Sequence, residues 1–474
     1  MAKTIFNTSE KSNFILNLTE EKYSSMASKA LAAACVLVSL FTIPVELLNT
    51  LTYSFVTAGL AVGGVLCMIL MLIAFIKKYV SKKLLIPVCA FGFMLIWGAV
   101  SLADSYSFQL GFYGMEGRGE GLLALIFYFC FFVTGLTLKT ENSVKTLITA
   151  VIATGLLNSV WGIVQVFTGM GSYKHLSLTL QPNAASGLVH SPIFLAMLLT
   201  LSLAAAVIGA VMSDNKIYRL FCIISSCIFS FTIIFTYSLM GIVGIALAVV
   251  ITVLAVFIAK APKARLATAS AVILPALAAF ILSAAGLIGD GSGYGLYDGR
   301  IMWRDSYNRI SASGLYDTDK MNPDSLSETY SCIYGETLDI IGDFPLTGAG
   351  PDQLVFPQLY SSVNIEENVG TFDKCYNEYL NTAASKGVPS AIALVVLVVS
   401  LIAIAFRGVR EENGSFTRVC TFFMLAVGAA LYLIGCSSIG VAPVFWAAAG
   451  ASCSYIKTAV TKAQSNKHKK VYGN

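Results

Sequence analysis

The chain has 474 residues, of which 56% are hydrophobic and 12% are charged, and its formal net charge at pH 7 is +5. This composition excludes a water-soluble fold, because soluble domains carry about 25% charged residues. The positive charge comes from clusters beside apolar segments, so it indicates membrane topology and not binding to nucleic acid.

The chain begins with residues 1–26, which are polar, mixed in charge and without the pattern of a cleaved signal peptide. We expect them to form a cytoplasmic N-terminal segment. The first apolar segment, from about residue 27, is then a retained membrane anchor.

Twelve apolar segments follow, and each is long enough to cross roughly 30 Å of hydrocarbon. The sequence therefore predicts an all-α, polytopic integral membrane protein of about 12 transmembrane helices. Nine helices fill a membrane domain over 27–288, three more occupy 383–457, and residues 458–474 form a basic tail. The expected spans are 27–48, 52–76, 84–103, 121–138, 146–168, 187–212, 219–237, 239–259, 266–288, 383–406, 418–436 and 440–457.

Basic residues recur at every second connection between these segments. With twelve spans they all fall on one side, and the positive-inside rule makes that side cytoplasmic. We therefore expect a multi-pass protein of the cell membrane with both termini cytoplasmic and residues 289–377 extracytoplasmic. The basic residues are Lys77, Lys78, Lys82, Lys83, Lys260, Lys263, Arg265, Arg407, Arg410, Arg418, Lys467, Lys469 and Lys470.

The long polar interruption between helices 9 and 10 is expected to form an extracytoplasmic loop subdomain, residues 289–382. Its residues 289–377 carry 14 Asp or Glu and 5 Lys or Arg. Within it, apolar spacing predicts an amphipathic helix over 330–341. Proline and glycine make 344–351 a loop. A further helix over 376–386 is expected to turn into the tenth span at Gly387-Val388-Pro389.

Most of the eleven cysteines lie inside the apolar spans, where they act as small hydrophobic residues. Cys332 and Cys375 alone belong to the outer segment, where they either pair in an oxidising compartment or stay free. No CxxC pair or histidine-rich cluster occurs, so neither a metal nor another cofactor is expected.

Two glycine-flanked arginines stand at outer ends of the spans, Arg118 before the fourth and Arg300 after the ninth. A guanidinium binds phosphate oxygens in a bidentate manner, and neighbouring glycines let a bulky anion approach the backbone. The alternative is interfacial snorkelling or a salt bridge with Glu116, Glu120 or Asp305.

His190 lies at the outer start of the sixth span. An ionisable group at membrane depth is a functional candidate by default. A hydrated structural histidine at the membrane rim is the alternative.

Several short motifs, taken in order over residues 105–406, resemble the O-antigen ligase/polymerase superfamily in the form found in bacteria with thick cell walls. Each motif is short, and their order and external placement carry the resemblance. They are Gly114…Arg118-Gly119-Glu120-Gly121-Leu122-Leu123, Ser186-Gly187…Pro192…Phe194-Leu195-Ala196, Gly299-Arg300…Trp303, Pro345-Leu346-Thr347-Gly348-Ala349-Gly350-Pro351-Asp352 and Asp373-Lys374…Asn377-Glu378-Tyr379-Leu380…Lys386-Gly387-Val388-Pro389.

The resemblance implies a glycosyltransferase that moves a glycan from undecaprenyl diphosphate to an acceptor hydroxyl of a glycan or another cell-envelope molecule. It implies no nucleotide sugar, no obligatory metal and no nucleic acid, with membrane lipid as the surroundings. Position by position, Arg118 and Arg300 take the diphosphate role. Arg304, Lys374 and Asn377 complete the expected substrate-binding set.

The sequence departs from the family pattern at the expected base, a histidine, where it has Tyr376. A phenol with a pKa near 10 is a poor base at neutral pH. Either Glu378, Asp373 or His190 serves instead, or Tyr376 orients the acceptor, or activity has been lost. Ser191-Pro192-Ile193 and extra residues after Trp303 are further departures.

We therefore predict a transferase that ligates or polymerises lipid-linked glycan. A transporter or flippase of lipid-linked oligosaccharide is the first alternative, although the sequence shows neither the internal repeats nor the midplane charges typical of transporters. A catalytically inactive relative is the second.

Overall fold

The computed structural model describes nine parts of the chain, and residues between them lie outside this description. The described residues are 18–40, 52–115, 118–168, 184–189, 191–288, 326–359, 372, 374–411 and 414–454, with the backbone alone for 52–57 and 326–332. The predicted site residues His190, Arg300, Arg304 and Asp373 fall outside them, as does the basic tail 458–474.

The fold is all-helical over the described residues, and twelve of its helices correspond one to one to the predicted spans. Nine are long and apolar enough to cross a membrane, α3 and α10 when counted with the 3-10 turns that precede them, while α5, α16 and α17 are shorter. The predicted fold class is therefore confirmed. The helices are α1 (Glu20–Leu40), α2 (Thr52–Ile76), α3 (Leu85–Ala103), α5 (Leu122–Leu136), α6 (Glu141–Thr168), α7 (Pro192–Met212), α8 (Lys216–Ile234), α9 (Leu239–Ile258), α10 (Ser270–Ala284), α15 (Glu378–Glu411), α16 (Phe416–Leu431) and α17 (Ala442–Cys453).

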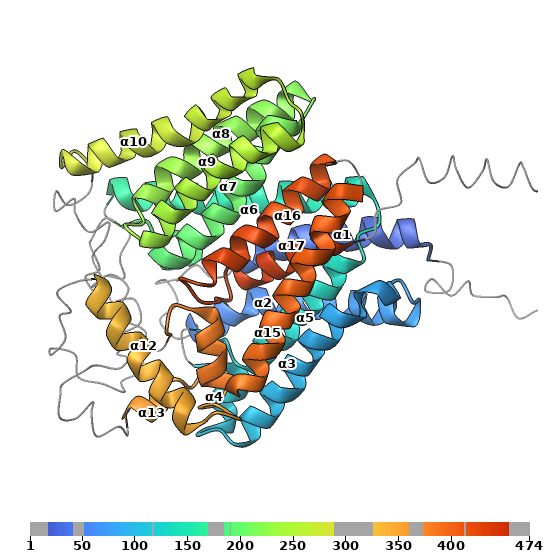
Figure 1. Ribbon diagram of the computed structural model, residues 1–474, viewed down its shortest axis with the longest axis vertical. Helices are drawn as coiled ribbons and strands as arrows, with labels where there is room; N and C mark the ends of the chain where they lie inside the picture. Colours follow the sequence, from blue (N-terminus) through green and yellow to red (C-terminus); the bar gives the residue numbers. More distant parts are fainter. Residues whose placement is uncertain are drawn as a thin grey trace, which may run out of the picture.

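Further helices occupy the connections. They are η1 (Lys82–Leu84), α4 (Phe108–Tyr113), η3 (Gly187–Val189), η4 (Lys263–Ala269), α12 (Leu326–Asp343) and α13 (Val355–Leu359). Figure 1 shows α4, α12 and α13 gathered on the same side of the molecule, next to the start of α15. The amphipathic helix predicted over 330–341 is therefore present as part of α12.

Helix α7 lies at the centre of the bundle. It packs against α6, α8, α9 and α16, and its most apolar window is 100% buried. A helix that is apolar on every side is expected in such a position. By contrast, α3 exposes Ile86, Ile96 and Val100, which marks a surface that faces lipid.

The first helix begins at Glu20 and not near residue 27 as expected from hydropathy. The Thr19 side chain accepts a hydrogen bond from the backbone N–H of Lys22 at 3.4 Å. Glu20 and Glu21 then occupy the first turn, where negative charge is favourable near the positive end of the helix dipole. A polar first turn therefore extends the helix beyond its apolar part.

Helix α15 is kinked where the sequence predicted a change of direction. Gly387 has φ 80° and ψ 159°, and an added Cβ would collide with the carbonyl oxygen of Leu346. The turn at 345–349 packs against this kink. Val388 N–H donates to Pro345 O at 2.9 Å, and Ala349 N–H donates to Ala384 O at 2.8 Å. Two distant glycine-containing motifs thus form one interlocked structure.

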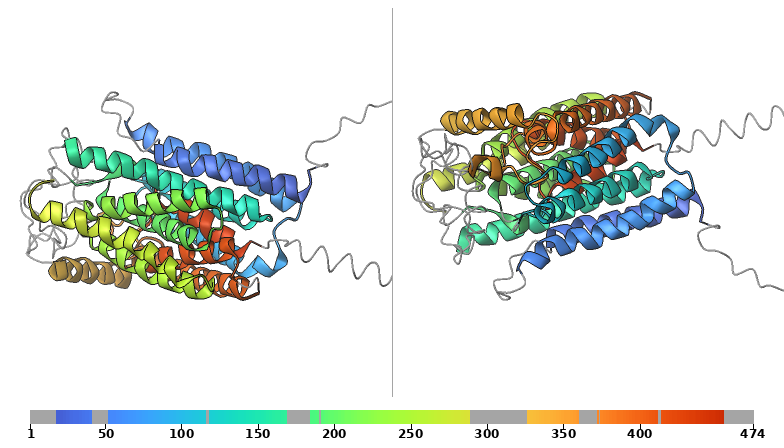
Figure 2. Two further views of the ribbon diagram at one scale, coloured as in Figure 1. Left: turned by 90° about the horizontal axis from the view of Figure 1, so that it is seen from above. Right: turned by 90° about the horizontal axis from the view of Figure 1, so that it is seen from below.

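The helices of the bundle run between two ends (Figure 2), and these ends carry different charged residues. At the basic end lie the loops that carry Lys77, Lys260 and Arg410, and Arg418 there donates to Ser454 O at the end of α17. At the opposite end, called the site end, lie the loop 104–121, the turn 345–349 and the start of α15. Thr347 Oγ1 donates to Asp104 Oδ2 at 2.7 Å there and joins two of these segments.

Candidate active site

The site end is built by two loops that are far apart in the sequence. Gln353 holds the 104–121 loop from both sides, because its Oε1 accepts from Ser107 N–H at 2.9 Å and its Nε2 donates to Ser107 O at 2.7 Å. Trp97 Nε1 on α3 donates to Leu346 O at 2.8 Å. These bonds hold the PLTGAGPD motif and the following Gln353 against α3 and against the loop that carries GRGEG.

Arg118 forms a buried ion pair with Asp352, and its side chain is 5% exposed. The same carboxylate accepts a hydrogen bond from Met115 N–H at 2.8 Å. A salt bridge was one predicted alternative for Arg118, although Asp352 was not among the expected partners. The guanidinium therefore ties the two loops together, and its predicted contact with a diphosphate stays a prediction.

Lys374 forms a second buried ion pair, with Glu120, and also donates to Ser437 O. Its ammonium group lies 5.6 Å from the centre of the Phe194 ring. The other oxygen of Glu120 accepts from Tyr128 Oη at 3.2 Å. Lys374 thus joins the 104–121 loop, the start of α7 and the loop between α16 and α17.

Tyr376 is completely buried and has left-handed backbone geometry, with φ 52°. Asn377 next to it caps α15, because its Oδ1 accepts from the N–H groups of Tyr379 and Leu380 at 3.1 and 3.2 Å. Tyr334 on α12 also hydrogen-bonds to the Asn377 side chain. In this chain Tyr376 is therefore a packed core residue and Asn377 is a helix cap.

Glu378 is buried and turned into the bundle. Its Oε2 accepts from Ser437 N–H at 2.8 Å, and its Oε1 accepts from Thr382 Oγ1 at 3.3 Å. Glu378 neither caps α15 nor pairs with Lys374, because Asn377 provides the cap and Lys374 pairs with Glu120. Among the described residues, no ion pair neutralises Glu378.

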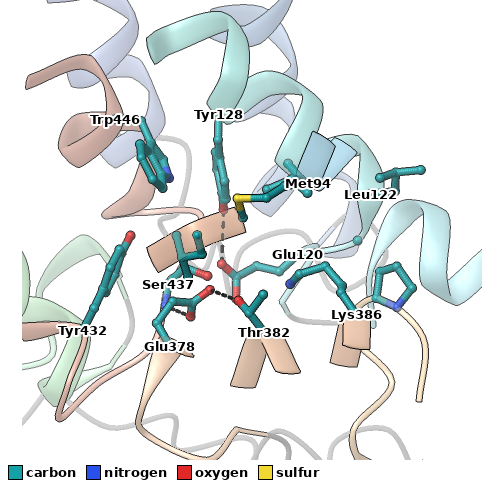
Figure 3. Close-up of a pocket in the computed structure, with 14 residues that line it drawn as sticks. Met94, Glu120, Leu122, Tyr128, Glu378, Thr382, Lys386, Tyr432, Ser437 and Trp446 are labelled. Atoms are coloured by element: carbon teal, nitrogen blue, oxygen red, sulfur yellow. Dashed lines mark hydrogen bonds between the residues drawn. The ribbon is translucent and has the colours of Figure 1, made fainter. Parts of the chain in front are cut away.

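A small cavity lies beside the side chains of Glu120 and Glu378, as Figure 3 shows. Its volume of about 30 Å³ holds one or two water molecules and is too small for a sugar ring. Charged and hydroxyl groups line one side and apolar side chains the other. The lining is Met94, Glu120, Gly121, Leu122, Leu125, Tyr128, Pro351, Glu378, Thr382, Lys386, Leu394, Tyr432, Ser437 and Trp446.

A pairing of Cys332 with Cys375 stays a prediction, because the Cys332 side chain lies outside the described residues. Cys375 is a buried free thiol that donates to Asn377 O at 3.1 Å. It also hydrogen-bonds to Cys436, and burial raises the pKa of the Cys436 thiol well above its usual value. The Cys436 thiol is therefore protonated at neutral pH.

Sequence reasoning missed several members of this site. Asp352 and Lys386 stand inside quoted motifs but were given no role, and Glu120 was considered only as a partner of Arg118. Ser437 takes part through its backbone, which no side-chain pattern reveals. The described residues contain no group of three His, Cys, Asp or Glu side chains suited to a metal ion.

Residues 220–395 match a family model described as O-antigen ligase. The chain carries an O-antigen ligase domain. The predicted superfamily is thereby confirmed, and with it a membrane glycan ligase or polymerase in general terms. The matched segment runs from α8 into the second half of α15 and includes Lys374, Glu378 and Lys386, whereas Arg118 and Glu120 precede it. No curated protein matches the chain.

Proposed function

We propose that this protein transfers a saccharide from undecaprenyl diphosphate to an acceptor hydroxyl at the outer face of the membrane, by ligation or polymerisation. The observation that supports the proposal most is the gathering of buried charged groups around one cavity at the site end. Two of the motifs that resemble the superfamily supply the charged groups of its lining, Glu120, Glu378 and Lys386, and a third motif supplies Pro351.

The outer face is assigned to the site end because the exposed lysines and arginines flank the opposite end. Positive loop residues favour the cytoplasm. Both termini then lie on the cytoplasmic side, and α12 and the turn 345–349 face outward. A lipid-linked glycan that has crossed the membrane would meet the site there.

Glu378 is the proposed base. It faces the cavity, and its carboxylate is held by two neutral donors and by no ion pair among the described residues. In the reaction, the acceptor oxygen bonds to the sugar carbon while the bond from that carbon to the diphosphate oxygen breaks. The electron pair leaves with the diphosphate, and the acceptor proton passes to Glu378.

Other predicted residues keep secondary roles in this proposal. Tyr376 is completely buried and does not line the cavity. Its role in this proposal is to position the start of α15. Arg300 and Arg304 remain proposed ligands of the donor, and Asp373 and His190 remain the next candidates for the base. All four lie outside the described residues.

The test is transfer by the purified full chain, with lipid-linked glycan extracted from a strain that lacks the protein and accumulates its donor. Glu378→Gln should lower the rate about 100-fold and alter the pH profile, because general-base catalysis contributes roughly 10²–10⁴-fold. Glu141→Gln, at the exposed start of α6, is the matched control. No transfer by wild-type protein would overturn the function, whereas an unchanged Glu378→Gln profile would move the base to Asp373 or His190.

A further inference from the structure

Two of the described cysteines lie outside helices, and both lie at the site end. Cys375 precedes α15, and Cys436 lies in the loop between α16 and α17. The predicted eleventh span, 418–436, includes Cys436, but α16 ends at Leu431 and leaves this cysteine beyond the helix. The other described cysteines lie within membrane helices. The loop therefore supplies a second thiol at the site end that hydropathy assigned to the apolar core.

The two thiols are in direct contact. The side chains of Cys375 and Cys436 hydrogen-bond to each other, and both residues are completely buried. Tyr334 of α12 interacts electrostatically with both thiols, so the pair lies where α12 meets the start of α15. A disulfide requires two side chains that are directed at each other across a short gap. This contact meets that requirement.

The two chain segments that carry these thiols are also fastened to each other. Glu378 N–H donates to Tyr432 O at 2.8 Å, and Ser437 N–H donates to Glu378 Oε2 at 2.8 Å. Lys374 donates to Ser437 O. These bonding residues stand before and after each cysteine. The thiols are therefore held together by the backbone around them, and joining them requires only a small local shift.

The compartment distinguishes this pair from other neighbouring cysteines. Cys67 of α2 interacts with Cys35 of α1 and Cys130 of α5, but these three lie inside the apolar bundle. Oxidation by thiol exchange requires a thiolate, and hydrocarbon surroundings disfavour such a charge. The site end faces outward in the proposed orientation, and disulfides form and persist outside the cytoplasm.

We propose that Cys375 and Cys436 are joined by a disulfide at the outer face of the membrane. This inference rests on the proposed orientation of the site end and adds a covalent modification that the transfer reaction does not itself require. Because both thiols are completely buried in the folded chain, the bond forms before the start of α15 is fully packed.

The oxidant is the disulfide of an extracytoplasmic thiol oxidoreductase. The thiolate of one cysteine attacks this disulfide and forms a mixed disulfide, and the thiolate of the second cysteine then displaces the oxidoreductase. One sulfur–sulfur bond breaks in the oxidant and one forms in this chain. The two electrons and two protons of the cysteine thiols end on the oxidoreductase, which leaves as a dithiol.

The cross-link fixes the proposed base relative to the loop that binds it. Cys375 lies just before Glu378, and Cys436 is adjacent to Ser437, whose N–H donates to the Glu378 carboxylate. The bond closes a segment of about 60 residues that contains α15 and α16, and closing so long a segment restricts the unfolded chain. The oxidised protein therefore holds the site end more firmly than the reduced protein.

The first test uses the wild-type sequence. Cells that produce the full chain are denatured directly in detergent with N-ethylmaleimide, which caps free thiols and prevents later exchange. Mass spectrometry of the non-reduced peptides should show Cys375 linked to Cys436, and reduction should separate the linked peptides. Cys35, Cys67 and Cys130 are the internal control and should carry the maleimide.

The outcomes separate this inference from the proposed function. Maleimide on both Cys375 and Cys436 would overturn the disulfide, and so would a link from Cys375 to Cys332. Transfer by a protein in which both thiols are free would leave the proposed function intact and remove the disulfide alone. A linked protein that transfers no glycan would overturn the function and leave the disulfide standing.

A second test reads the covalent connection on a gel. A protease site inserted after Gly414, between α15 and α16, divides the chain between the two cysteines. The cleaved protein should run as one band in denaturing detergent and as two bands after reduction. Cys436→Ser should give two bands without reductant, whereas Cys89→Ser, at an exposed cysteine, should behave like the unsubstituted chain. Two bands from the unsubstituted chain without reductant would overturn the inference.

Discussion

The two ends of the helix bundle differ in how most of their charge is placed, although Arg418 at the basic end is also buried. At the basic end, lysines such as Lys77, Lys83 and Lys260 stand in short loops at the surface. At the site end, Arg118, Glu120 and Lys374 are buried and held by partners from distant segments. Burying a charge is expensive unless it is paired and hydrogen-bonded. Exposed charge can therefore serve topology alone, whereas the buried cluster indicates a site that requires charge in a confined space.

The largest expected effect is a difference in cysteine labelling between the two ends of the bundle, because they are expected to face different compartments. With Cys89, an exposed native cysteine, changed to serine, cysteine placed at Leu346 should react with an impermeant maleimide in intact cells. Cysteine placed at Lys82 should react only after lysis. The reverse pattern would contradict the proposed orientation, and with it the outer-face reaction.

Removing one partner of a buried ion pair should affect stability far more than removing an exposed charge. Asp352→Ala leaves Arg118 buried without this carboxylate and should destabilise the protein by about 3–5 kcal/mol. Lys145→Ala should change stability by less than about 0.5 kcal/mol, because exposed helical pairs contribute little. Both are measured by thermal unfolding in detergent, and similar effects at the two positions would remove the contrast between the ends.

The kink of α15 should be the next most sensitive feature of the site end. Gly387→Ala forces a non-glycine residue into a positive φ and against Leu346 O, so it should destabilise by at least about 1–3 kcal/mol. Gly92→Ala is a matched control in α3, since an added Cβ there meets nothing within 4 Å. Equal unfolding temperatures for the two variants would mean that the kink is not rigid.

The smallest effect is expected at the position where the family has its histidine. Tyr376→Phe keeps the buried ring and removes only the hydroxyl, so transfer should stay within about twofold of wild type. Tyr376→Ala should reduce it more strongly through lost packing. A loss in Tyr376→Phe as severe as in Tyr376→Ala would show that the hydroxyl takes part in the reaction.

The membrane helices could be predicted from the sequence because their signal is local. Uninterrupted apolar windows gave all twelve helices, and glycine with proline at 387–389 gave the change of direction in α15. The start of α1 was misplaced because hydropathy does not register a polar first turn stabilised by Thr19 and Glu20.

The sequence predicted some residues of the site but not their arrangement. The motifs contain Arg118, Glu120, Lys374 and Glu378, but their pairing depends on contacts across hundreds of residues. Arg118 and Asp352 are 234 positions apart, and Lys374 and Glu120 are 254 apart. Both pairs depend on how the loops fold over the helix ends, which hydrophobic periodicity does not encode. The cavity is still harder to predict, because four helices and three loops together define it.

The interlock between the 345–349 turn and the α15 kink makes the outer segment modular. Because Ala349 and Val388 fasten the chain at this point, the route taken before α12 can lengthen or shorten without moving Glu378 or Lys386. The start of α15 is thus positioned by a local fastening and not by the length of the chain before α12.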